Sequence, residues 1–161
     1  MLHKLPEITE YVPSSSSRPT GIETGVEAEE KEFCEKWDKF YSKHKSGDFF
    51  KPRRYLTVEF GKYLSCMNDG DSVVEVGCGH GCSMFPLIES FPCQYIATDY
   101  SAEVLYILKK NENFDTIRCT AGLWDVTMPL SKSIWSQINT PIKAVLAIFA
   151  LSAVHPDYHV Q

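Results

Sequence analysis

A short apolar run followed by three closely spaced glycines limits the possible folds of this chain more than any other feature. Ser72–Val76 is rich in valine and predicts a buried strand. Glycines follow at 77, 79 and 81, and such a loop lets the backbone pass against a ligand where a Cβ would clash. A helix that begins near Gly81 would direct free N–H groups and its positive dipole end at that ligand. A second apolar run ends at Asp99, whose carboxylate is placed to accept hydrogen bonds from a ribose diol. Together these elements predict the nucleoside-binding half of a Rossmann-like sheet.

The spacing of the glycines indicates which nucleoside fits. Dinucleotide-binding loops follow G-x-G-x-x-G and hold a pyrophosphate at the helix N-terminus. Here the pattern is G-x-G-x-G, and Glu75 stands two residues before the first glycine. A carboxylate that faces the pocket suits a ligand with a cationic end and no phosphate. This favours S-adenosylmethionine over a nicotinamide or flavin cofactor. The alternative, a tight turn that binds nothing, leaves Glu75 and Asp99 unexplained.

Composition limits the class of protein. A chain of 161 residues with 43% hydrophobic content predicts one domain with a real core. The sequence contains no run of 18 apolar residues, so we expect no membrane span. The first thirty residues also lack a signal-peptide pattern. Six scattered cysteines favour reduced thiols, and therefore the cytoplasm, with the nucleus as the alternative. Cys78, His80 and Cys82 lie within the glycine turn, so we expect no metal site.

Charge is unevenly distributed along the chain. Residues 34–62 carry eight basic and four acidic side chains, whereas the segments before and after them are net acidic. A basic segment in an acidic protein is a candidate surface for phosphate groups. The solvated face of a helix is the alternative interpretation.

The pattern along the chain predicts three parts: a disordered tail over 1–26, a helical segment rich in aromatic and basic residues over 27–68, and part of a Rossmann-like domain over 69–161. Helices are expected to about residue 47, from about 55 to 67, and over 102–110. A third strand is expected over 116–120. Residues 144–151 are apolar on both faces, which is typical of a central parallel strand.

Several motifs resemble one family in particular, the eukaryotic methyltransferase-like enzymes that make N3-methylcytidine in tRNA. The glycine motif alone indicates only a class I methyltransferase. The aromatic-basic block and the last motif are much narrower, and the resemblance spans about residues 30–158. The matching segments are Trp37–Tyr41, Phe49–Lys51 with Arg53, Glu59–Phe60, Glu75–Gly81, Phe85–Leu87, Asp99–Ser101 and Ile148–Asp157.

The resemblance implies a set of residues that bind S-adenosylmethionine. From the residues alone, core packing of an amphipathic helix is the preferred explanation of Trp37 and Tyr41, whereas the resemblance implies that they cap the donor. Gly77 would lie under the methionine part, and Asp99 would take the ribose hydroxyls. The remaining expected contacts are Asp125 and Val126 at the adenine and Ile148 near the methionine end. Asp125 is alternatively a helix N-cap.

The resemblance also implies the acceptor, a cytidine at position 32 in the anticodon loop of tRNA. The in-plane lone pair of cytosine N3 is unprotonated at neutral pH, so catalysis is chiefly positioning and needs no strong base. Base pairing uses N3, so the target must be splayed from the loop. Lys51, Arg53 and Arg54 would contact RNA phosphates while Phe49, Phe50 and Tyr55 stack bases. Ser152 and His155 are the candidates to face the substrate. An aminoacyl-tRNA synthetase is a further partner that the family implies.

Two departures from the family pattern keep alternatives open. Pro52 stands where the family usually has an acid, and Tyr55 where it usually has tryptophan. The chain also has sequence for about four strands, in the expected order 3-2-1-4, of the seven in a class I methyltransferase. We therefore expect the donor-binding half, truncated after the fourth strand. The alternatives are a methyltransferase with a protein or small-molecule acceptor, and a truncated product that binds the donor without catalysis.

Overall fold

A computed structural model describes residues 35–45, 49–128, 134, 136 and 138–154 of the chain. The chain divides into two units, Met1–Phe33 and Cys34–Gln161, and all described residues belong to the second. The tail predicted over 1–26 lies outside the described residues.

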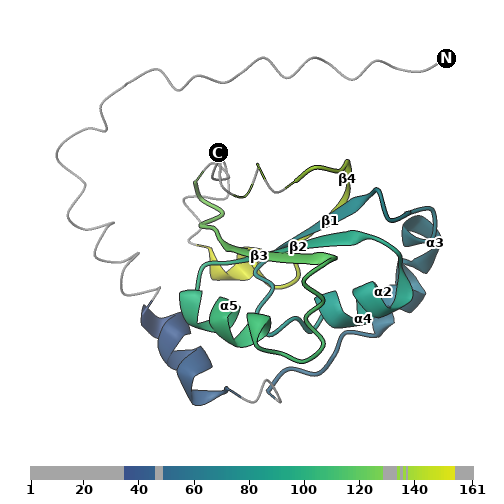
Figure 1. Cartoon of the computed structure of the whole chain (residues 1–161). Coiled ribbons are helices and arrows are strands. Elements are labelled where there is room, and N and C mark those ends of the chain that lie inside the picture. Colours follow the sequence, from purple (N-terminus) through teal and green to yellow (C-terminus); the bar gives the residue numbers. More distant parts are fainter. Residues whose placement is uncertain (1–34, 46–48, 129–133, 135, 137, 155–161) are drawn as a thin grey trace. The chain divides into compact units, whose positions relative to one another are not determined.

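Four parallel strands form a single sheet in the second unit (Figure 1). They are β1 Ser72–Val76, β2 Gln94–Asp99, β3 Cys119–Leu123 and β4 Ile142–Leu146. Their order is β3-β2-β1-β4, which confirms the predicted topology. Val74 pairs with Ile96 on β2 and with Val145 on β4. This register places the carboxyl ends of β1 and β2 side by side, where parallel α/β sheets bind ligands.

Helices cover one face of this sheet (Figure 1). They are the helical residues 35–43, α2 Tyr55–Glu59, α3 Gly61–Leu64, α4 Met84–Ser90 and α5 Ala102–Lys109, with a 3-10 turn η1 at Leu151–Ala153. The α5 prediction is confirmed to within one residue. One helix was expected from 55 to 67, but Phe60 leaves the helical conformation with φ −106° and ψ 2°, and the segment becomes two short helices.

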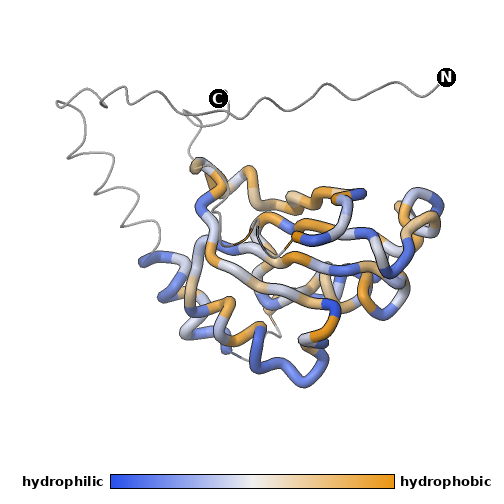
Figure 2. Tube along the Cα trace, turned by 45° about the horizontal axis from the view of Figure 1, so that its top comes forward, coloured by the Kyte–Doolittle hydropathy of each residue, from blue (hydrophilic) through white to orange (hydrophobic). Residues whose placement is uncertain are grey.

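The main core lies between the sheet and these helices. Every residue of β1 is buried, and Val73 and Tyr95 pack on Met84, Leu87 and Leu108 from α4 and α5. On the opposite face a smaller cluster contains Val74, Ile96 and Ile134. Apolar residues follow the strands, and hydrophilic residues gather in the connecting loops (Figure 2).

Two strands differ from the predicted positions. The third strand begins at Cys119 rather than 116, because Asp115 closes a turn before it. Asp115 Oδ1 accepts the N–H of Ile117 at 2.9 Å and Oδ2 accepts Arg118 Nε at 3.0 Å, and such local bonds compete with strand pairing. The fourth strand ends at Leu146 rather than 151. It pairs with β1 alone among the described strands, so it lies at an edge, and Val145 is 63% exposed.

Candidate functional site

The three glycines form a left-handed turn directly after β1. Their φ values are 68° at Gly77, 53° at Gly79 and 80° at Gly81, a region that favours glycine. A Cβ on Gly77 would lie 2.8 Å from the Cβ of Ala150, and one on Gly81 would lie 2.7 Å from the ring of Phe85. Conformation and space both require glycine, and the loop after β4 packs directly on the turn.

Asp99 ends β2 beside the glycine turn and orders it. Its Oδ2 accepts the N–H of Gly79 at 2.8 Å, and its Oδ1 accepts the N–H of Ser101 at 3.0 Å. Burial raises the pKa of Asp99, and these backbone N–H groups act in the opposite direction. Each carboxylate oxygen can accept more than one hydrogen bond, so the side chain can hold the turn and also accept hydroxyl groups from a ligand.

Glu75 lies on β1 and is fully buried. Its Oε2 accepts the hydroxyl of Tyr95 at 2.8 Å, while Oε1 has no hydrogen-bond partner among the described residues. Burial raises the pKa of Glu75 to about 7. The hydroxyl groups of Ser83 and Tyr95 and the positive charge of Arg53 act in the opposite direction and lower this pKa. The sequence interpretation expected a carboxylate that faces the pocket, and the structure places it beneath the glycine turn.

The helical residues 35–43 lie against the same turn. Trp37 and Tyr41 stack with ring centroids 5.7 Å apart, and a Cβ on Gly79 would lie 3.3 Å from the Tyr41 hydroxyl oxygen. Ser101 Oγ donates a hydrogen bond to Asp38 Oδ1, which fixes this helix to the end of β2. Tyr41 therefore belongs to the core and to the wall of the turn at once, so packing and donor contact are compatible roles.

His80 occupies the middle of the turn and was considered from sequence only as a metal ligand. Its ring lies edge-on to Tyr41, with centroids 5.1 Å apart. Both ring nitrogens are buried without a hydrogen-bond partner in the described part of the chain, and burial lowers the pKa of the imidazole. At neutral pH the His80 imidazole is therefore uncharged, and it packs against Tyr41 of the helical residues 35–43. Within the described ranges, no three His, Cys, Asp or Glu side chains group closely enough to hold a metal ion.

The residues expected at the adenine and methionine ends lie after β3 and β4. Asp125 Oδ1 accepts the N–H and the hydroxyl of Thr127, at 2.8 and 2.6 Å, so this side chain closes a local turn. Val126 is half-buried beside it. Ile148 packs on the main core, and Gly77 meets Ala150, two residues after Ile148. The adenine and methionine contacts remain predictions.

The three basic residues expected at RNA phosphates lie in different surroundings. Lys51 is exposed. Arg54 is exposed too, and its Nη1 lies 3.0 Å from Glu89 Oε2. Arg53 turns inward instead: its Nη1 donates to Ser83 Oγ at 2.9 Å and its N–H donates to the Cys82 carbonyl at 2.7 Å. Arg53 therefore belongs to the glycine turn.

The aromatic residues expected to stack bases also divide into two groups. Phe49 and Phe50 contact each other and Phe40, with ring centroids 4.8 to 6.0 Å apart, so they extend the aromatic cluster of the first helix. Tyr55 is exposed at the start of α2. Sequence reasoning missed Phe149, which follows β4 and lies beside Arg53; its φ of 61° gives no signal in the sequence. Ser152 Oγ donates to the Phe149 carbonyl at 2.7 Å, and His155 lies outside the described residues.

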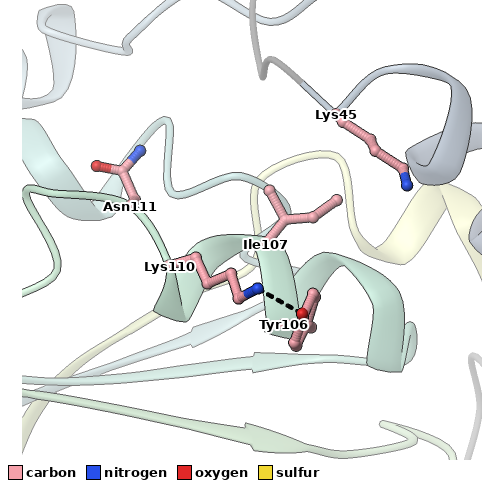
Figure 3. A pocket seen from close by; sticks show the side chains of 5 residues that line it. All are labelled: Lys45, Tyr106, Ile107, Lys110 and Asn111. Carbon is pink, nitrogen blue, oxygen red and sulfur yellow. Dashed lines mark hydrogen bonds between the residues drawn. The ribbon is translucent and has the colours of Figure 1, made fainter.

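A pocket whose lining includes no residue of the glycine turn lies over α5 (Figure 3). Its lining residues are Lys45, Tyr106, Ile107, Lys110 and Asn111. Lys110 Nζ donates to the Tyr106 hydroxyl, and Lys45 lies 3.9 Å from Glu103. Surface lysines with partners of their own do not define a ligand site, so we assign none here.

No helix in the described part of the chain is long and apolar enough to cross a membrane.

Comparison with solved structures agrees with the fold. A SAM-dependent methyltransferase of Anabaena variabilis superposes with a TM-score of 0.53 at 21% sequence identity, over 71% of this chain and 47% of that one. The predicted fold, a Rossmann-like parallel sheet with strand order 3-2-1-4 flanked by helices, is confirmed. No family model matches the sequence.

Comparison with curated proteins gives closer relatives. The human tRNA N(3)-cytidine methyltransferase METTL6 is 37% identical over 133 residues, which are 80% of this chain and 45% of that protein. The tRNA N(3)-methylcytidine methyltransferase trm140 of Schizosaccharomyces pombe is 32% identical over 75% of this chain and 40% of its own length. The tRNA(Thr) (cytosine(32)-N(3))-methyltransferase of Saccharomyces cerevisiae is 31% identical over 75% of this chain and 20% of its own length. The chain spans about half the length of the first of these relatives, and by sequence it belongs to the family of tRNA N(3)-cytidine methyltransferases.

Proposed function

We propose that this chain is the donor-binding part of an enzyme that transfers a methyl group from S-adenosylmethionine to N3 of a cytidine in tRNA. The observation that carries the proposal is the glycine turn ordered by Asp99 and walled by Tyr41. The relatives' names supply the acceptor, and the name of the S. cerevisiae relative supports position 32; the anticodon-loop location is part of the proposal. A synthetase partner and a cytoplasmic or nuclear location are parts of the same proposal.

The residues present fit the donor. Asp99 accepts hydrogen bonds and is held by two backbone N–H groups, so its orientation toward a ribose is fixed before binding. Trp37 and Tyr41 offer an aromatic wall that suits a sulfonium cation. Asp99 places a buried carboxyl group at the turn, and the one guanidinium that the described residues place there, that of Arg53, donates to Ser83 Oγ. Asp125, Val126 and Ile148 remain the proposed contacts at the two ends of the donor.

Bound donor supplies an electrophilic methyl carbon on a positively charged sulfur. In the transfer, the N3 lone pair forms the new N–C bond while the C–S electron pair returns to sulfur, which becomes a neutral thioether. The positive charge passes to the methylated cytosine, and no proton is abstracted. The protein's task is to align the base and to exclude water, so we assign no catalytic acid or base. Ser152 and His155 stay candidates for orienting the substrate.

Replacement of Asp99 by alanine tests donor binding directly. Loss of a hydrogen bond to a charged group costs about 1.5–3 kcal/mol, so we expect Asp99→Ala to weaken S-adenosylmethionine binding at least tenfold by calorimetry. Asp115→Ala is the matched control, since Asp115 also closes a local turn but lies in the turn that precedes β3. Equal donor affinity in the wild type and Asp99→Ala would refute the assignment.

A methyltransferase with a different acceptor remains the second candidate. The observation in its favour is that Arg53 faces the glycine turn and Arg54 pairs with Glu89, so two of the three expected RNA contacts have protein partners. Because a surface ion pair contributes little stability, a phosphate can still compete for Arg54. The salt dependence of tRNA binding separates these two candidates.

A further inference from the structure

Phe149 combines two unfavourable properties that nothing in the described part of the chain offsets. It is the one residue other than glycine with positive φ among the described residues, at 61°. This conformation is costly for a residue with a Cβ, and strain of this kind is typical of functional sites. Its side chain is also 77% exposed, so the strain is not compensated by burial of the ring. The ring is held out into solvent at the carboxyl end of the sheet.

The turn that carries Phe149 is fixed to the glycine turn. Ser152 Oγ donates to the Phe149 carbonyl at 2.7 Å, and the N–H of Ala153 donates to the Ala150 carbonyl at 3.0 Å. Ala150 meets Gly77 so closely that a Cβ on Gly77 would lie 2.8 Å away. The exposed ring is thus positioned beside the proposed donor site by a rigid local structure.

Arg53 lies over the ring of Phe149. The guanidinium carbon is 5.9 Å from the ring centroid, within the range of a cation–π contact. Arg53 is itself fixed by Ser83 Oγ and by the Cys82 carbonyl. One face of the ring is therefore supported by an anchored cation, which leaves the other face for a ligand.

We propose that Phe149 is the stacking platform for the acceptor nucleobase and that Arg53 is the positioning residue that orients its ring. The inference rests on the proposed function, because it takes the acceptor to be a base. A flat, exposed aromatic ring stacks bases of any identity, and a base stacked there would lie next to the glycine turn. Stacking uses only the face of the base, so the in-plane lone pair of cytosine N3 stays unoccupied and can attack the donor methyl group in line.

The test uses the full chain, saturated with S-adenosylmethionine, and a single-stranded oligoribonucleotide with the anticodon-loop sequence of a tRNA. Loss of one base–aromatic stack weakens binding about fivefold or more, so we expect this loss in Phe149→Leu. Phe149→Tyr keeps the ring and should bind within about twofold of the wild type. Val145→Ala, an exposed apolar change on β4, is the control. Arg53→Gln should weaken binding of the oligonucleotide less than Phe149→Leu does.

A second variant separates stacking from structure. Phe149→Gly removes the ring and adopts positive φ without strain, so its oligonucleotide affinity should fall as in Phe149→Leu even though the backbone conformation is retained. Donor affinity should stay unchanged in Phe149→Tyr and Phe149→Leu, which keep a side chain at this position. If Phe149→Leu binds as tightly as Phe149→Tyr, the ring does not stack a base, and the inference is wrong while the proposed function stands. If the wild type binds donor but no RNA, the tRNA acceptor fails and the platform fails with it.

Discussion

The buried carboxyl of Glu75 predicts that this protein becomes less stable as pH rises from about 4.5 to about 7. Burial raises its pKa in the folded state to about 7, from an ordinary value of 4.5. A carboxyl group with a raised folded-state pKa imposes no ionisation penalty below pH 4.5, because it is then protonated in both states. Between pH 4.5 and 7 the unfolded chain ionises first, so the free energy of unfolding falls; above pH 7 the full penalty applies.

The size of the penalty follows from the difference between the two pKa values. A difference of about 2.5 pKa units corresponds to about 3 kcal/mol at 25 °C. Glu75 is fully buried, so solvent screening does not reduce this value greatly. Glu75→Gln keeps an oxygen to accept the Tyr95 hydroxyl and cannot ionise. We therefore expect the variant to match the wild type near pH 4.5 and to exceed it by about 3 kcal/mol at pH 8.

Urea unfolding at pH 4.5, 6 and 8 measures this difference, with Glu89→Gln as a control that alters an exposed glutamate. The gain of Glu75→Gln must grow with pH, while the control stays constant. A difference between Glu75→Gln and wild type that is independent of pH would show that Glu75 ionises normally and would refute the reasoning.

Two further predictions concern surfaces of the second unit. Replacing Lys51 and Arg54 by glutamine should weaken tRNA binding and lower its salt slope by up to about two units, with donor affinity unchanged; an unchanged slope in a salt titration would favour a non-RNA acceptor. The outer edge of β4 is unpaired among the described strands, and Val145 there is 63% exposed, so the polypeptide 1–161 should self-associate. Val145→Lys should then shift it toward monomer in size-exclusion chromatography, and a wild type that is already monomeric would contradict this.

The elements that the sequence predicted well are those with strong local signals. The valine run of β1 and the apolar run that ends at Asp99 gave correct strands, because each is buried on both faces. The glycine turn followed from its spacing, since left-handed φ at 77, 79 and 81 needs glycine. Helix α5 was expected over 102–110 and found over Ala102–Lys109, and the structure adds the cap, because the Ser101 side chain accepts the N–H of Val104.

The features that sequence could not supply depend on tertiary contacts. Nothing in the run from 144 to 151 reveals that the strand ends at Leu146, because the next residues pack on Gly77 through Ala150. The basic segment around Arg53 predicts a surface cation. In the structure, however, Arg53 donates a hydrogen bond to Ser83, thirty residues later, and lies at the glycine turn. Local charge patterns carry no information on such distant partners.

One measurement tests the central claim, that the glycine turn binds a methyl donor, most directly. S-adenosylmethionine and NAD are titrated separately into the chain by calorimetry, with Asp99→Ala in parallel. The turn after β1 has the spacing G-x-G-x-G, with Glu75 and Asp99 buried beneath it. We predict that S-adenosylmethionine binds one to one, that NAD does not bind, and that Asp99→Ala loses at least tenfold in affinity. Binding of NAD in preference to S-adenosylmethionine, or no binding of S-adenosylmethionine at all, would contradict the claim.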